Sequence, residues 1–84
     1  MITETSLESF RQIVDLGDRQ RVVYNTIKMY PGESNRTLGI ILNKPINTIT
    51  PRVKELRVLG LVKEDDKKYD KVTNRWVMTW RAVP

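Results

Sequence analysis

The 84-residue chain contains no cysteine and no histidine. These absences exclude a disulfide framework, a thiolate nucleophile and the usual Cys/His zinc sites. Acid–base or nucleophilic catalysis would have only carboxylates, lysines, tyrosines and hydroxyl groups to use. The acidic pair Asp65–Asp66 is typical of a solvated turn, and the sequence contains no glycine-rich phosphate loop. We therefore expect a protein that is not an enzyme, that holds no metal or other cofactor and that has no evident small-molecule ligand.

The chain also lacks a long hydrophobic run. Its longest apolar stretches, Gly39–Leu42 and Trp76–Met78, are far shorter than the roughly 18 to 20 residues that a membrane span requires. The start, Met1–Glu4, has no basic residues of the kind that open a signal peptide. We expect a soluble, cytoplasmic protein without a membrane partner, and the length predicts one compact domain.

Charge is distributed unevenly along the sequence. The whole chain carries +5, whereas residues 1–18 hold four acids against Arg11 alone and carry −3. The remaining 66 residues therefore carry +8, from 14 Lys and Arg against six Asp and Glu. A basic body of this size favours a polyanionic partner such as nucleic acid, although surplus lysine and arginine also keep proteins soluble.

The first segment shows the signature of a short amphipathic helix. Thr5–Glu8 matches a capping box, which predicts a helix from about Ser6 to Leu16, and Gly17 is a suitable left-handed stop. The apolar residues in this segment fall at spacings of three and four and form one stripe. The stripe either packs on its own domain or pairs with a second copy in a homodimer. Its members are Leu7, Phe10, Ile13 and Val14.

Two further helices are predicted around a sharp turn. Asp18 is a suitable cap for a helix that runs to about Tyr30 and ends at Pro31–Gly32. Ser34 then caps a helix over Asn35–Leu42. The apolar periodicity of the two helices predicts one shared core. The residues expected to face it are Val23, Ile27, Tyr30, Leu38, Ile41 and Leu42.

A third helix follows after a short connection. Gly39 lies inside a short helix, where glycine costs about 1 kcal/mol relative to alanine, so we expect the following helix to approach it closely. Asn47 or Thr48 is expected to cap this third helix, which ends near Leu59 before Gly60. Its predicted buried face consists of Ile49, Val53 and Leu56.

From Leu61 the periodicity changes from helical to alternating. Leu61–Glu64 and Trp76–Val83 are predicted strands, separated by the polar segment Asp65–Arg75. In the second strand Trp76, Met78 and Trp80 share a face, which we expect to cover the helices rather than to stack on bases. The result is a three-helix core followed by a β-hairpin with a long tip.

The second and third helices, joined by a tight turn, form a helix-turn-helix, in which the third helix is presented to the major groove of DNA. Opposite its buried face, and on the flanks of that opposite side, lie polar and basic side chains that contact bases or phosphates in such proteins. Each has an alternative role, since Asn47 and Thr48 also cap helices and Arg52 has Glu55 three residues on. The candidate contacts are Asn47, Thr48, Thr50, Pro51, Arg52, Lys54 and Arg57.

The hairpin tip supplies a second basic element that is able to lie along the phosphate backbone, although a solvated loop would have a similar composition. Tyr69 lies among its charges. The candidate DNA contacts in the hairpin and in the segments that flank the recognition helix are Lys67, Lys68, Lys71, Arg75, Arg36 and Lys44.

Residues Ser34–Val62 resemble the helix-turn-helix of the winged-helix superfamily. The match is nearest to small phage and prophage winged-helix proteins and more distant to multiple-drug-resistance-type regulators. It is carried by Pro45-Ile46-Asn47, Ile49-Thr50-Pro51-Arg52, Glu55-Leu56, Gly60-Leu61-Val62, Thr73-Asn74-Arg75 and Trp80-Arg81, with Asn74 where glycine is usual.

The resemblance implies an α+β winged helix-turn-helix over residues 18–84, preceded by an extra N-terminal helix over residues 1–17. It further implies binding of double-stranded DNA, as a phage or prokaryotic regulator of transcription or replication, in the host cytoplasm if the protein is phage-encoded. Winged helices also serve as protein-docking modules, and this alternative stays open. The expected partner is therefore duplex DNA. A homodimer through the N-terminal helix stays open beside packing of that helix on its own domain.

Overall fold

The computed structural model describes Ile13 and residues 15–84. The expected N-terminal helix lies largely outside the described residues. At its predicted end, Leu16 is buried in the core and Ile13 packs against that core. Gly17 has an extended backbone with φ −66°, so the prediction of a left-handed stop at this glycine is wrong.

Helix α2 spans Asp18–Met29. It begins from Gly17, whose N–H donates to the Gln20 side-chain oxygen at 3.1 Å, so the prediction that Asp18 caps this helix is wrong. Gln20 at the third helical position supplies the reciprocal half of a capping box. Asp18 instead occupies the first turn, where a carboxylate interacts favourably with the helix dipole.

Helix α3 spans Asn35–Leu42. Its predicted cap is confirmed, because the Ser34 hydroxyl accepts a hydrogen bond from the Thr37 N–H at 3.3 Å. The predicted close approach at Gly39 is also present, but it comes mainly from the connection after the helix. A Cβ on this glycine would lie 2.8 Å from the Lys44 carbonyl oxygen and 3.7 Å from Ile49 Cγ1.

Helix α4 spans Ile46–Val58 and starts earlier than predicted. Pro45 occupies the cap position without a side-chain bond, so neither Asn47 nor Thr48 caps the helix. The fixed φ of proline suits the turn into a helix, and the Pro45 carbonyl accepts from the Thr48 N–H at 2.9 Å. At the other end Gly60 has φ +77°, the left-handed conformation expected of a glycine beyond a helix.

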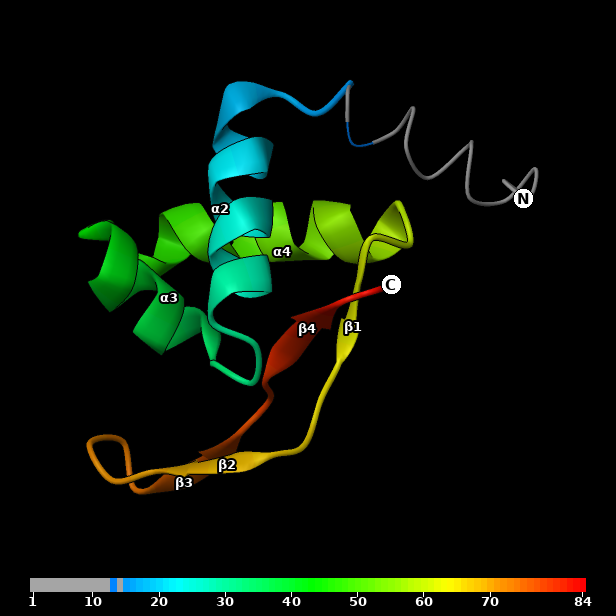
Figure 1. The fold of residues 1–84 in the computed structure, drawn as a ribbon. Helices are drawn as coiled ribbons and strands as arrows, with labels where there is room; N and C mark the ends of the chain where they lie inside the picture. Colours follow the sequence, from blue (N-terminus) through cyan, green and yellow to red (C-terminus); the bar gives the residue numbers. More distant parts are fainter. Residues whose placement is uncertain (1–12, 14) are drawn as a thin grey trace.

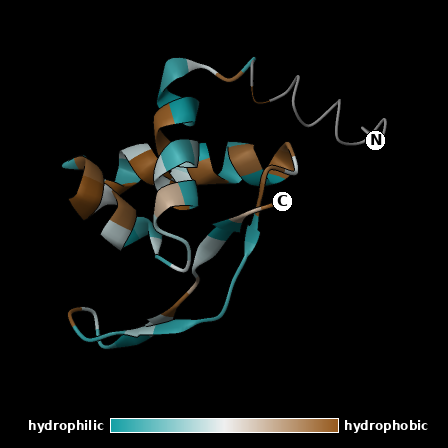
Figure 2. Cartoon of the chain, viewed as in Figure 1, coloured by the Kyte–Doolittle hydropathy of each residue, from teal (hydrophilic) through white to brown (hydrophobic). Residues whose placement is uncertain are grey.

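The three helices enclose one hydrophobic core, with α2 packed across α3 and α4 (Figure 1). Figure 2 shows long hydrophobic stretches on α3 and α4 and a mainly hydrophilic ribbon along β1 and β2. Ile41 is 39% exposed and Tyr30 45% exposed, so their predicted core positions are wrong. The hydrophobic residues that form the core are Leu16, Val23, Tyr24, Ile27, Leu38, Ile49, Val53, Leu56, Leu61, Val62 and Trp80.

Four short strands follow α4 and form two antiparallel pairs. Strand β1 (Val62–Glu64) pairs with β4 (Trp80–Ala82), and β2 (Lys68–Asp70) pairs with β3 (Arg75–Val77). We call residues 65–79, which contain β2 and β3, the wing. A bridge between Glu33 and Trp80 ties the turn before α3 to the other edge of β4.

The single strand predicted over Trp76–Val83 is interrupted at Met78–Thr79. Thr79 turns inward, is 1% exposed and donates its hydroxyl to the Asp66 carbonyl oxygen. Because Thr79 and Trp80 are buried in succession, the alternation of side chains slips by one. Trp76 is consequently 67% exposed, and its predicted position in the core is wrong.

Candidate nucleic-acid interface

Helix α4 has one buried face and three accessible sides. The predicted buried face is confirmed, since Ile49, Val53 and Leu56 are at most 2% exposed. The opposite side carries Asn47, Pro51 and Lys54, all exposed. The other candidate side chains on α4 divide between a side near α2 and a side near the wing.

Arg52 and Thr48 lie on the side near α2. The guanidinium of Arg52 donates from Nη2 to Glu55 Oε2 at 2.9 Å, and its Nε lies 2.7 Å from Oε1 at an ion-pair distance without hydrogen-bond alignment. Gln20 Nε2 donates to the same carboxylate at 3.0 Å. The Gln20 hydrogen bond, followed by the Arg52 guanidinium, lowers the pKa of Glu55. The structural alternative for Arg52, pairing with the acid three residues on, is therefore present.

An accessible hollow of about 290 Å³ lies on that same side of α4. Lys44, Thr48 and Arg52 line it together with Arg19 and one acid, Asp18, from the start of α2. Lys44 is exposed there and lies apart from the cations of the wing. This hollow gives α4 a cationic border on the α2 side, which we call the α2 edge.

On the other side, a groove of about 630 Å³ separates α4 from the wing. Its surface is mainly apolar, and Trp76, Val77 and Met78 form its wing side. Thr50 lines its helix side. Four cations and one acid also border this groove: Arg36, Lys54, Arg57, Arg75 and Asp70.

Trp80 connects the core to two polar side chains of α4. The buried indole N–H donates to Asn35 Oδ1 at 2.7 Å, which directs the Asn35 amide nitrogen toward Thr50 Oγ1 at 3.4 Å. The Thr50 hydroxyl in turn donates to the Ile46 carbonyl at 3.1 Å, so its remaining capacity toward a ligand is that of an acceptor. Arg57 lies over the Trp80 ring, 4.7 Å from its centroid, and also pairs with Glu64 at 3.0 Å.

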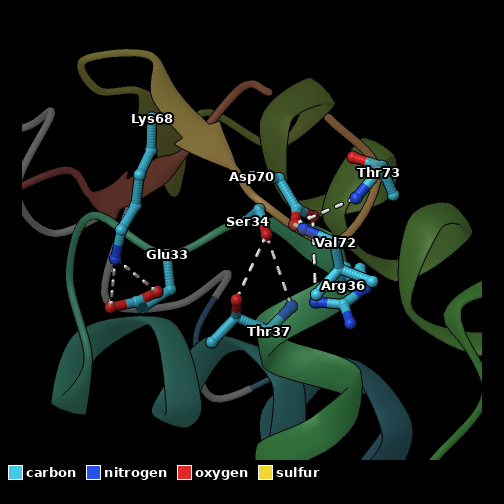
Figure 3. A network of polar contacts seen from close by, with 8 residues as sticks. All are labelled: Glu33, Ser34, Arg36, Thr37, Lys68, Asp70, Val72 and Thr73. Atoms are coloured by element: carbon cyan, nitrogen blue, oxygen red, sulfur yellow. Dashed lines mark hydrogen bonds and ion pairs between the residues drawn. The ribbon is translucent and has the colours of Figure 1, made fainter. Parts of the chain in front are cut away.

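Ion pairs fasten the wing to the start of α3 (Figure 3). Lys68 Nζ lies 3.3 Å from a Glu33 carboxylate oxygen, and Arg36 Nη1 lies 3.7 Å from Asp70 Oδ2. These pairs are accessible to solvent, so each contributes little to stability. They nevertheless direct Lys68 and Arg36 toward acids instead of toward open solvent.

Asp70 also orders the tip of the wing. Its Oδ1 accepts from the Val72 N–H at 2.9 Å and from the Thr73 N–H at 3.4 Å. The Val72 hydrogen bond lowers the pKa of Asp70 most, and Thr73 and Arg36 add to this effect. The predicted wing contacts Lys67, Lys71 and Arg75 are exposed around this ordered turn.

Eight of the thirteen predicted site residues therefore fall into two groups, and Asn47, Pro51, Lys67, Lys68 and Lys71 belong to neither. Thr50, Lys54, Arg57, Arg36 and Arg75 border the groove, whereas Lys44, Thr48 and Arg52 form the α2 edge. Asn35 was not predicted as a site residue. A polar residue in the first turn of a helix is common, so nothing in the sequence marked its contact with Trp80. The sequence reasoning also missed the exposure of Trp76, because an alternating strand pattern does not reveal a break.

Over the described residues, no helix is long and apolar enough to cross a membrane, and no group of acidic side chains is suited to hold a metal ion. No protein-family model and no curated protein matches the sequence. Among solved structures, the chain is similar to a MarR family transcription regulator, with a TM-score of 0.66 at 18% identity. The match covers 92% of this chain and 47% of that protein, so the chain spans about half of its length. The likeness confirms the predicted winged-helix fold.

Proposed function

We propose that the protein binds double-stranded DNA through a winged helix-turn-helix, with α4 in the major groove. The observation that carries the proposal is the exposed side of α4, where Asn47, Pro51 and Lys54 project between two cationic borders. The major groove is about 12 Å wide and admits one α-helix. A helix placed there meets a phosphate backbone on each side, and α4 has basic residues on both.

The two borders have distinct roles in this proposal. Lys44, Thr48 and Arg52 on the α2 edge approach one strand, and Arg57, Arg75, Lys67 and Lys71 approach the other. Asn47 lies between them and Thr50 lies at the groove border, and the polar atoms of both meet base edges. Lys68 leaves its ion pair with Glu33, and Arg36 leaves its ion pair with Asp70, and each then contacts phosphate.

One solved structure similar to this chain is that of a transcription regulator, which supports a regulatory role for duplex binding here. We extend the proposal to a phage or prokaryotic regulator of transcription or replication that acts in the cytoplasm. The alternative function is a winged-helix module that docks on a protein, with its basic face incidental.

Titration of a random-sequence duplex at two salt concentrations tests the proposal. Each phosphate contact contributes about −0.9 to the slope of log K against log salt, so binding should weaken steeply as salt rises. Absence of binding at low salt would favour protein docking.

Lys54→Ala and Lys28→Ala form a matched pair for the same titration. Both lysines are exposed on helices, but Lys54 borders the groove and Lys28 lies on α2 beside the Tyr24 ring. We expect Lys54→Ala to weaken binding to all sequences and to reduce the salt slope by about 1, with Lys28→Ala unchanged. Equal affinities for the two variants would show that the exposed side of α4 does not face DNA.

A further inference from the structure

The wing has two faces with different chemistry. Lys68 and Asp70 point from one face toward Glu33 and Arg36, which bind that face to the start of α3 (Figure 3). Because side chains alternate along a strand, Tyr69 belongs to the other face. Its cross-strand partner is Trp76, and the two rings meet edge to face with centroids 5.5 Å apart.

This second face exposes apolar area that the fold does not use. Trp76 is 67% exposed, Tyr69 is 42% exposed, and Val72 at the tip is 73% exposed. We call Tyr69, Val72 and Trp76 the wing wedge. Single exposed apolar residues are ordinary on protein surfaces, but three within eight residues of one small hairpin, among them a tryptophan, favour a binding surface.

The wedge is held in position before any partner arrives. Asp70 accepts from the backbone N–H of Val72, and the same carboxylate pairs with Arg36. Asn74 adopts a left-handed conformation, with φ +58°, and its side chain accepts a hydrogen bond from the Tyr69 hydroxyl. A tip that is already ordered loses little conformational entropy when it binds.

The surroundings of the wedge indicate a polyanionic partner. Lys71 precedes Val72 at the tip and is exposed, and Arg75, also exposed, is the cross-strand partner of Asp70 at the edge of the wing toward α3. Trp76 also lines the groove that Lys54 and Arg57 border, so the wedge continues the surface assigned to DNA. A purely apolar protein partner would leave these cations without counterions, whereas a nucleic-acid duplex offers phosphates beside stacked bases.

We propose that the wing wedge inserts at a base step from the minor groove, partly unstacks that step and bends the duplex. Apolar side chains inserted in this way kink DNA, and flanking cations neutralise the adjoining phosphates. The proposal rests on duplex binding by α4 and adds to it a deformation of DNA. Flexible pyrimidine–purine steps are therefore the favoured targets, because they unstack most easily.

Energy transfer across a short duplex labelled at both ends, with affinity measured in the same titration, tests the proposal. The wild-type protein should shorten the end-to-end distance and bind a duplex with central TA steps more tightly than one with a central A-tract. Trp76→Ala with Val72→Ala should lose the bend, the step preference and about 5-fold or more in affinity for the TA duplex. Trp76→Phe should retain the bend, and Met29→Ala, which removes an equally exposed apolar side chain from α2, should change nothing.

Trp76→Thr provides a second variant with a good strand-forming residue, and circular dichroism checks that each variant is folded. Equal bending by the wild type and by folded variants without the wedge would overturn the proposal, as would wild-type binding without any bend. Tighter binding of single strands than of duplexes would also overturn it. A wild-type protein that binds no duplex at low salt would instead refute the proposed function itself.

Discussion

At the scale of single residues, Trp80 performs two tasks with different parts of one side chain. Its ring face supports Arg57 and its N–H fixes the Asn35 amide, while the ring itself is 6% exposed in the core. Core packing and the arrangement of one polar group on α3 and one on α4 therefore depend on one residue. Substitutions at this position separate the two tasks.

Trp80→Phe retains an aromatic ring but removes the indole N–H. We expect a loss of about 1 to 3 kcal/mol in the free energy of unfolding, because Asn35 Oδ1 loses its donor and the smaller ring fills less of the core. Trp80→Ala should lose about 3 to 5 kcal/mol, because it leaves a larger cavity. Urea denaturation measures both values, with the exposed Trp76→Phe as the matched control. A Trp80→Phe variant as stable as the wild type would show that the Asn35 bond contributes nothing.

Gly39→Ala in α3 has two opposite effects on stability. At an interior helical position, alanine stabilises the helix by about 1 kcal/mol relative to glycine. The added Cβ would, however, lie 2.8 Å from the Lys44 carbonyl oxygen, a backbone atom that cannot rotate away. We expect the clash to prevail and the melting temperature to fall, whereas Ile40→Ala, at a 63% exposed position of the same helix, should change it little. A more stable Gly39→Ala variant would show that the connection after α3 yields easily.

At the scale of elements, α4 was predicted more accurately than the wing for a physical reason. The buried face of a helix repeats over several turns, so Ile49, Val53 and Leu56 define it even when the first residue is misplaced. A strand carries its pattern over a few residues, and the inward turn of Thr79 reverses the side on which Trp76 lies. The groove and the Asn35 contact join segments distant in sequence, which local periodicity does not reveal.

The Asp70 turn predicts a pH response confined to the wing. Hydrogen bonds from Val72 and then Thr73, together with Arg36, lower the pKa of Asp70. The ordering of the tip is therefore complete above the ordinary aspartate pKa of about 3.9 and is lost as the pH falls through the lower folded value. The Val72 amide chemical shift should follow this titration with a midpoint below the ordinary one, and Asp70→Asn should abolish it. A titration midpoint at or above the ordinary aspartate pKa would show that Asp70 does not hold the turn through these hydrogen bonds.

At the scale of the whole molecule, charge and apolar surface are separated along the chain. Residues 1–18 carry −3, while the rest carries +8. An acidic segment is repelled by phosphate, so in a DNA complex it should lie away from the duplex. One member of the predicted apolar stripe, Ile13, packs against the domain core, in which Leu16 is buried. Leu7 and Phe10 lie outside the described residues.

We propose that Leu7 and Phe10 join two copies of the protein. A single winged helix contacts a short stretch of DNA, and a two-fold pair doubles the buried surface and strongly raises the affinity for paired half-sites. Light scattering should find a dimer for the full chain and a folded monomer for Leu7→Lys with Phe10→Lys, a variant that leaves Ile13 and Leu16 intact. Val58→Lys, a charge added at a position on α4 that is 79% exposed, serves as the control and should remain dimeric. A full chain that stays monomeric at high concentration would show that the stripe packs on its own domain instead.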